Sequence, residues 1–226
     1  SGNIGSVRIA QKVGSVEFKN FLEEIGVLSQ IEFDIDEIAT QENFNFGKCK
    51  LATASFGHGV TTTILQLAKG YAILSNGGFD IKPTLVNKNS NKKKKRILKK
   101  GVSEKVVKVL RKIVSTEEGT AKLADVLHYE IAGKTGTAQQ PKKGKYSRVK
   151  INTFASIFPS SKPQYAFIVM LDSPKTSSSY IYDYRHKDGT QTGTPYNTAG
   201  WTSVEVAGKI IDKIGPILAT KYMEIN

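Results

Sequence analysis

The residues best suited to chemistry lie in one short run, Lys134-Thr135-Gly136-Thr137-Ala138, at the end of a predicted strand. Lys134 supplies a positive charge for a reacting group, and the hydroxyls of Thr135 and Thr137 can donate hydrogen bonds to a carboxylate. Gly136 has no side chain, so a substrate backbone can lie against the strand there. A turn after an edge strand would use the same residue types, so this run by itself does not distinguish a functional site from a turn.

The second signal is the triplet Ser1-Gly2-Asn3, which opens a predicted helical segment. A Ser-x-Asn triplet followed later by Lys-Thr-Gly is part of a pattern known in penicillin-binding proteins and class A β-lactamases, where a Ser-x-x-Lys precedes both. No Ser-x-x-Lys occurs here at a position that this pattern allows. The sequence therefore carries two of the three motifs.

Further segments make the resemblance specific. They are, in chain order, Ser55-Phe56-Gly57-His58-Gly59, Leu65-Gln66-Leu67-Ala68, Asn76-Gly77-Gly78, the Lys-Thr-Gly run, Asn152-Thr153-Phe154-Ala155 and Ala199-Gly200-Trp201. Together they resemble the division-specific class B penicillin-binding proteins, and the similarity covers essentially the whole chain. Two departures are His58, where the family usually has Tyr, and Ile64, where it commonly has Pro. We expect neither to abolish activity.

The resemblance implies a peptidoglycan D,D-transpeptidase that forms a serine acyl-enzyme. In this family Ser1 would relay protons near the nucleophile, Asn3 would hold the substrate amide, and Lys134 would set the electrostatics of the relay. Thr135 and Thr137 would bind the terminal carboxylate beside Gly136, with the Thr137 backbone N–H as half of the oxyanion hole. The implied ligands are peptidoglycan stem peptides and β-lactam antibiotics.

The resemblance also implies that residues 1–226 are a partial transpeptidase domain, incomplete at the N-terminus. We expect the nucleophile, its lysine base, a pedestal region and a membrane anchor upstream, so the isolated chain should be inactive. The parent would sit in the bacterial inner membrane with its catalytic domain facing the periplasm. Its partners would be division-complex membrane proteins, including a lipid II glycosyltransferase.

The positioning elements can be predicted from periodicity. Apolar residues recur every three to four positions over 5–28, 62–77 and 103–115, which predicts helices there. Gly14-Ser15 breaks the first segment into two, and Ser15 is a plausible N-cap. We expect Thr62 or Thr63 to cap the second helix and Ser103 the third. Residues 31–50 have no clear period and are interpreted as loop with short strand pieces.

The period changes after residue 128. Short runs rich in Ile, Val, Phe and Tyr at 128–132, 151–158 and 164–172 predict consecutive strands joined by hairpins, and an amphipathic helix over 203–218 follows. Helices, a strand meander and a closing helix predict an α+β fold with an antiparallel sheet flanked by helices. The long 173–200 segment contains Tyr180 and Tyr182, which could line a substrate groove or belong to a surface insertion.

Charge and composition leave few other classes open. The formal charge is +13, with the densest basic run at 92–96, which favours anionic partners or simply keeps the surface soluble. No nucleic-acid fold signature accompanies it, so no nucleic-acid partner is expected. Single Cys49 and three scattered histidines predict no metal or cofactor. A β-lactamase or a D,D-carboxypeptidase would share the triplets, but the Ser-Phe-Gly-His-Gly segment and the closing helix argue against both. A non-catalytic penicillin sensor remains as an alternative.

Overall fold

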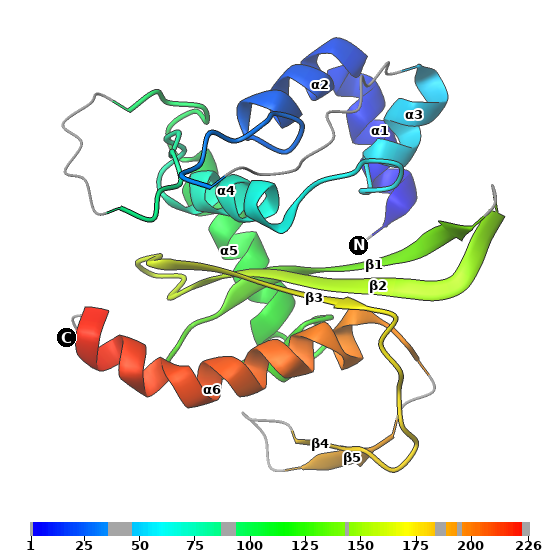
Figure 1. The fold of residues 1–226 in the computed structure, drawn as a ribbon, viewed down its shortest axis with the longest axis vertical. Helices are drawn as coiled ribbons and strands as arrows, with labels where there is room; N and C mark the ends of the chain where they lie inside the picture. Colours follow the sequence, from blue (N-terminus) through cyan, green and yellow to red (C-terminus); the bar gives the residue numbers. More distant parts are fainter. Residues whose placement is uncertain are drawn as a thin grey trace.

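A computed structural model describes residues 2–35, 47–86, 94–142, 145–183, 189–193 and 196–222. Its central layer is an antiparallel sheet, with α4 and α5 on one face and α6 on the other (Figure 1). The helices α1, α2 and α3 form a further group beyond α4. This arrangement confirms the predicted α+β fold with helices on both faces of an antiparallel sheet.

The sheet consists of β1 (Ala132–Lys142), β2 (Lys145–Phe158) and β3 (Tyr165–Asp172), in that order. Thr135 lies opposite Phe154, and Phe154 lies opposite Val169, so the three strands are adjacent and antiparallel as predicted. Within the described residues, β1 is therefore an edge strand.

The first strand begins later than predicted and extends further. His128 and Glu130 have φ values of 71° and 44°, which belong to a turn, and the expected strand over 128–132 is wrong for most of its length. The Lys-Thr-Gly run lies inside β1 instead of at its end. Its Gly, Thr and Gln residues show no apolar alternation, so the residue pattern did not indicate a strand there. The strand is formed by backbone pairing to β2.

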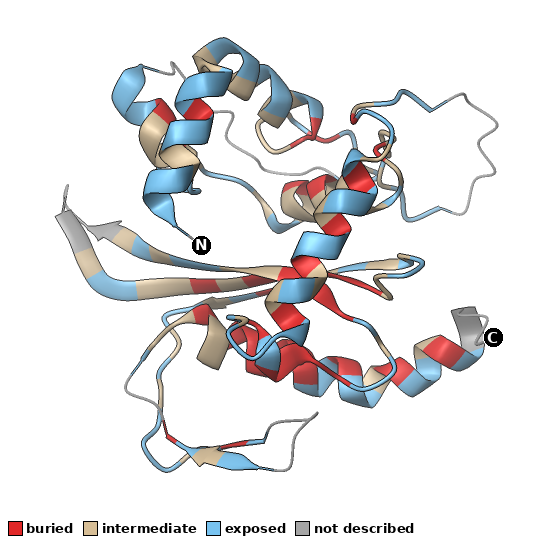
Figure 2. Ribbon diagram, turned by 180° about the vertical axis from the view of Figure 1, so that it is seen from behind, coloured by how far each residue is buried: buried red, intermediate tan, exposed pale blue. Residues whose placement is uncertain are grey.

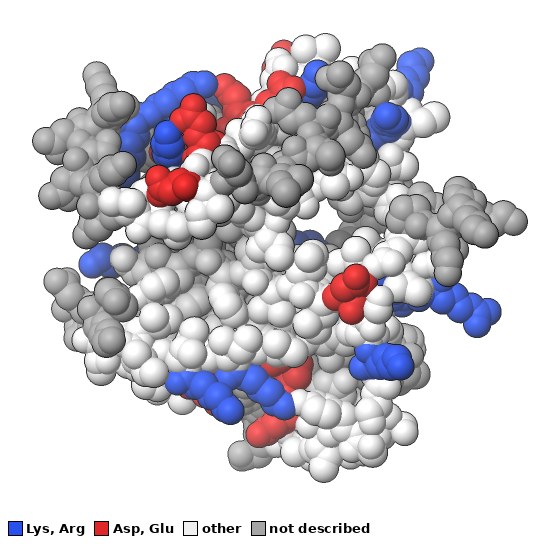
Figure 3. All heavy atoms as spheres, viewed as in Figure 1, with Lys and Arg blue, Asp and Glu red and all other residues white. Residues whose placement is uncertain are grey.

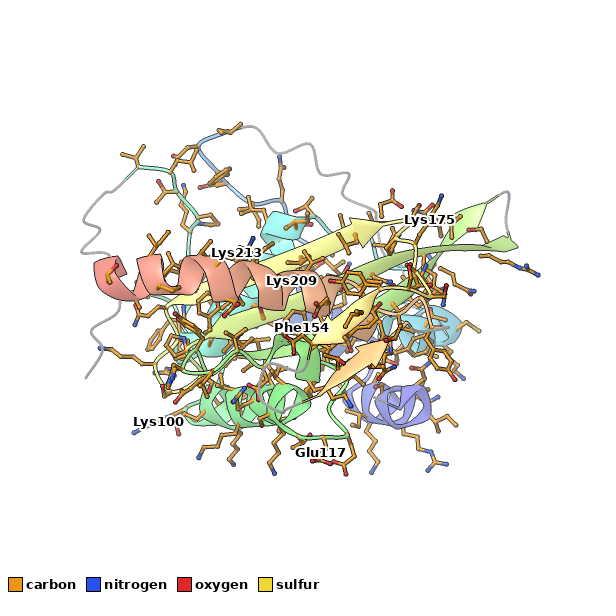
Figure 4. All side chains as sticks on the ribbon, turned by 90° about the horizontal axis from the view of Figure 1, so that it is seen from below. Lys100, Glu117, Phe154, Lys175, Lys209 and Lys213 are labelled. Atoms are coloured by element: carbon orange, nitrogen blue, oxygen red, sulfur yellow. The ribbon has the colours of Figure 1, made fainter. Side chains whose placement is uncertain are left out.

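One face of the sheet packs on α6 (Ser203–Tyr222). Phe154 is completely buried there against Val204 and Ile211, and Figure 4 shows Phe154 beside α6, which carries Lys209 and Lys213. Buried residues concentrate along this contact and on the central strands (Figure 2). The helix extends beyond the predicted range of 203–218, and Ile217 near the end of that range is 56% exposed.

The opposite face packs on α4 (Ile64–Ser75) and α5 (Val102–Ser115). Thr63 caps α4 in a capping box with Gln66, which confirms the expected cap. The predicted Ser103 cap of α5 is wrong, because the N-cap is Gly101. Ser103 is buried, and its hydroxyl donates to the Leu74 carbonyl at 2.6 Å.

The remaining helices are α1 (Asn3–Val13), α2 (Ser15–Glu24) and α3 (Lys48–Ala54). Gly14 separates the first two at φ 89°, as predicted, but the N-cap of α2 is Gly14 and not Ser15. The α3 helix starts inside a segment that was expected to be loop. Its seven residues are too few to show a helical period clearly.

Residues 173–202 contain β4 (Ile181–Asp183), β5 (Thr190–Thr192) and the short 3₁₀ helix η2 (Ala199–Trp201). A second short 3₁₀ helix, η1 (Lys122–Ala124), precedes β1. Tyr182 is 3% exposed and packs edge-on against Trp201, so this aromatic belongs to the core and does not line a groove.

The 92–96 basic run is described only from Lys94 onward. Lys94, Lys95 and Arg96 are exposed. The Arg96 guanidinium lies over the Phe79 ring, 4.1 Å from its centre, and Lys95 pairs with Glu24 at 3.2 Å.

Candidate active site on the β1 edge

The candidate site is built on β1, where Lys134 to Thr137 face Ala155 to Asn152 of β2. Side chains alternate between the two faces of a strand, so Lys134 and Gly136 share the face of Ala132, which packs on α5. Thr135 and Thr137 share the face of Phe154, toward α6. The edge strand thus presents an ammonium group on one face and two hydroxyls on the other.

Lys134 is half-buried, and its Nζ donates a hydrogen bond to the carbonyl of Thr135 at 2.8 Å. Burial lowers the pKa of Lys134 below its ordinary value, because the charged ammonium loses hydration. A lysine of this kind combines a positive charge with an easier proton loss, which suits a group next to a proton relay.

The two threonine hydroxyls each have a partner outside the strand. Thr135 Oγ1 lies 3.0 Å from Thr120 Oγ1, and Thr137 Oγ1 accepts a hydrogen bond from the Ala199 backbone N–H at 3.0 Å. Sequence reasoning identified neither Thr120 nor Ala199 as a contact of these threonines. No local pattern could reveal them, since Ala199 is 62 positions from Thr137.

Gly136 is exposed, and the nearest atoms to a Cβ built on it belong to Thr153, at 3.9 Å. The backbone here is therefore open on the side where a side chain would project. This is the geometry expected where another backbone approaches a strand.

The start of β1 is held by a partly buried ion pair. Arg111 Nη1 on α5 lies 2.6 Å from Asp125 Oδ1 and donates to the Ile131 carbonyl at 2.7 Å. The charged guanidinium of Arg111 donates to both groups and holds the chain at Ile131, one residue before β1 begins at Ala132. The ion pair thereby contributes to the placement of Lys134.

Ser1 lies outside the described residues, and Asn3 is the exposed first residue of α1. The expected proximity of Ser1 and Asn3 to Lys134 therefore stays a prediction.

Charged side chains are distributed unevenly over one face of the molecule. On the face shown in Figure 3, acidic and basic groups gather over the upper helices and over α6, and most of the surface between them is uncharged.

In the described part of the chain, no group of three acidic, histidine or cysteine side chains could hold a metal ion. None of the helices in the described ranges combines the length and apolar character that a bilayer crossing needs.

The β1 edge thus combines a half-buried lysine, a glycine that is open on its side-chain side and two hydroxyls with partners outside the strand. The sequence matches the family described as the penicillin binding protein transpeptidase domain over residues 1–191. The chain belongs to this family.

Named relatives agree with this assignment. The chain is 28% identical to the Caulobacter vibrioides (strain NA1000 / CB15N) protein named "Probable peptidoglycan D,D-transpeptidase FtsI", over 98% of this chain and 37% of that protein. It is 31% identical to "Stage V sporulation protein D" of Bacillus subtilis (strain 168), over 77% of this chain and 29% of that protein. The chain thus spans about a third of the length of these curated relatives.

Solved structures share the fold. The transpeptidase domain of Burkholderia pseudomallei penicillin-binding protein 3 superposes with a TM-score of 0.74 at 21% identity, covering 95% of this chain and 61% of that one. The transpeptidase domain of Legionella pneumophila FtsI4 gives a TM-score of 0.61 at 22% identity, covering 94% of this chain and 66% of that one.

Proposed function

We propose that this chain is the part of a peptidoglycan D,D-transpeptidase that binds the donor stem peptide and stabilises its acyl transfer. The observation that carries the proposal is the β1 edge, where Lys134, Thr135, Gly136 and Thr137 lie together in a chain of the transpeptidase family. The names of relatives such as the Caulobacter protein point to the same reaction.

The proposed reaction has two steps. A serine outside these 226 residues attacks the carbonyl between the two D-Ala residues of a stem peptide, and the leaving amine takes a proton as the terminal D-Ala departs. An amine of a neighbouring stem then attacks the acyl-enzyme ester, forms the crosslink and returns the proton to the serine. Ser1 and Lys134 belong to the proton relay, and Asn3 holds the substrate amide.

The proposed substrate-binding roles on β1 are those that the family resemblance implies. The substrate backbone runs along the edge at Gly136, and the hydroxyls of Thr135 and Thr137 donate to its terminal carboxylate. The backbone N–H of Thr137 forms half of the oxyanion hole. One such donor is typically worth about 3 to 4 kcal/mol of transition-state stabilisation.

We further propose that the parent acts in septal wall synthesis, anchored in the inner membrane with this domain in the periplasm. Its partners there would be division-complex proteins, including a lipid II glycosyltransferase. These assignments depend on the class B resemblance of the sequence motifs. Co-purification of the full-length protein from cross-linked membranes would test them, and recovery only from the cytoplasmic fraction would contradict them.

The reaction is tested with the full-length protein that contains this chain. Fluorescent penicillin should label it stably, peptide mapping should find the adduct on a serine outside residues 1–226, and a donor stem peptide with an amine acceptor should give a crosslinked product. Absence of labelling would refute the proposal. Rapid hydrolysis of the adduct would instead indicate a β-lactamase.

A further inference from the structure

Asn152 on β2 is a completely buried polar residue directly opposite Thr137 of β1. Its Nδ2 donates to Asn197 Oδ1 at 2.7 Å and to Thr202 Oγ1 at 2.8 Å. Among the described residues, its buried Oδ1 has no hydrogen-bond partner. A buried acceptor without a partner is unfavourable, so this carbonyl oxygen contributes nothing to the stability of the fold.

The two bonds of Asn152 hold both ends of η2. The Thr202 hydroxyl in turn donates a hydrogen bond to the Thr198 carbonyl at 3.0 Å. Asn197 Nδ2 donates to the Pro174 carbonyl at 2.6 Å, and Lys150 Nζ donates to the Asn197 carbonyl at 2.9 Å. Residues 197–202 are therefore fixed to the sheet on either side of η2.

Between these two anchors lies the N–H that binds Thr137. The Ala199 N–H donates to Thr137 Oγ1, which occupies one lone pair of that oxygen. The hydroxyl hydrogen must then point elsewhere, and Thr137 is exposed at the open edge. This contact leaves Thr137 as a donor toward a bound group.

The same 3₁₀ helix also touches the segment that carries Thr120. A Cβ on Gly200 would lie 2.6 Å from the Thr120 carbonyl oxygen, so the two backbones are in close contact. Thr120 Oγ1 in turn lies 3.0 Å from Thr135 Oγ1. The helix η2 therefore supplies the partner of Thr137 and contacts the residue that partners Thr135.

We infer that Asn152 is a positioning residue for carboxylate binding: it holds η2 so that the Ala199 N–H orients the Thr137 hydroxyl as a donor. This inference deepens the proposed function and depends on it for the identity of the ligand. The ligand class is a peptide or β-lactam that carries a carboxylate next to the reacting carbonyl.

The test compares Asn152→Leu with wild type in the full-length protein. The ligands are a penicillin and its uncharged methyl ester, and the measured quantities are the pre-acylation dissociation constant and the acylation rate constant. The dissociation constant for penicillin should rise on the order of tenfold, as expected for a weakened hydrogen bond to a charged group. The values for the ester should stay within about twofold, because it has no carboxylate to lose.

Ser156→Ala is the matched control. Ser156 lies on the same face of β2, is completely buried, and donates to the Phe167 carbonyl at 2.8 Å on the side away from β1. This variant should lose stability without a difference between penicillin and ester. If Asn152→Leu does not fold, Thr202→Val removes one of the two bonds with little change in shape and should show a smaller loss of the same selectivity.

Unchanged penicillin binding in Asn152→Leu, or equal losses for penicillin and ester, would overturn the inference. Hydrogen exchange at the Ala199 amide tests the positioning role of Asn152 independently of the proposed function. That amide should exchange faster in Asn152→Leu whatever the ligand. Wild-type protein that is never acylated would refute the proposed function, while unchanged Ala199 exchange would refute the positioning role of Asn152.

Discussion

A methyl group added at Gly133 of β1 should destabilise the protein, whereas one added at Gly136 should leave its stability nearly unchanged. A Cβ on Gly133 would lie 2.7 Å from the Ala155 carbonyl oxygen and 2.7 Å from ring carbons of Phe154. Phe154 is completely buried under α6, and the carbonyl belongs to the backbone of β2, so neither group can move easily. Comfortable carbon contacts are about 3.5 to 4.0 Å, so β1 would have to shift by about 1 Å.

The shift at Gly133 should cost about 1 to 3 kcal/mol, as overpacking usually does. For a domain of this size the melting temperature should fall by roughly 3 to 10 °C. Because Lys134 would move with the strand, acylation by penicillin should slow by up to about a hundredfold. Calorimetry and fluorescent-penicillin labelling of full-length Gly133→Ala measure both effects.

Gly136→Ala is the companion variant, since its Cβ meets nothing closer than 3.9 Å. Its stability should stay within about 0.5 kcal/mol of wild type. Acylation should nevertheless fall at least tenfold, because the methyl group would project where the substrate backbone lies. Wild-type acylation of Gly136→Ala would refute the proposed substrate path, and a wild-type melting temperature of Gly133→Ala would refute the packing described for β1.

Four further predictions concern other parts of the chain. Lys134→Met should lower acylation of the full-length protein by orders of magnitude, yet raise its stability near neutral pH. Burial lowers the pKa of Lys134, so between that lowered pKa and the ordinary value of 10.5 only the unfolded chain keeps the proton. Wild-type stability should therefore rise as the pH climbs through this window. The variant should lack this rise in pH-dependent calorimetry. Neutralising the 92–96 basic run should leave acylation almost unchanged at physiological salt, because exposed charges beyond a Debye length of ~8 Å are screened. A large drop in the acylation rate would show that the run steers substrate. Thr63→Ala should destabilise the α4 cap by about 1 kcal/mol in calorimetry, and no change would contradict the capping box. The isolated 226-residue chain should not be acylated, and a mapped adduct on any of its residues would overturn the upstream placement of the nucleophile.

Several elements could be predicted because their signals are local. The Thr63 cap and the apolar period of 62–77 are set by residues within one or two helical turns. The apolar runs at 151–158 and 164–172 are buried strands, which identify themselves by composition. The Lys-Thr-Gly motif and its neighbours likewise predicted the transpeptidase family, which the family match confirms.

Other features depended on contacts that have no local signal. Residues 133–142 are polar and Gly-containing, and they form a strand because β2 supplies the backbone partners. Ser103 is a suitable cap by type, but its hydroxyl donates to the Leu74 carbonyl, 29 positions away. A side chain chooses its hydrogen-bond partner by distance in space, which the order of residues does not specify.

The candidate site divides in the same way. The sequence by itself determined which residues carry the charge, the bare backbone and the hydroxyls, because these are properties of Lys134, Gly136, Thr135 and Thr137 as residue types. Only the tertiary structure decided the orientation of those hydroxyls, because their partners come from distant segments that meet β1 after the sheet and α6 have packed together.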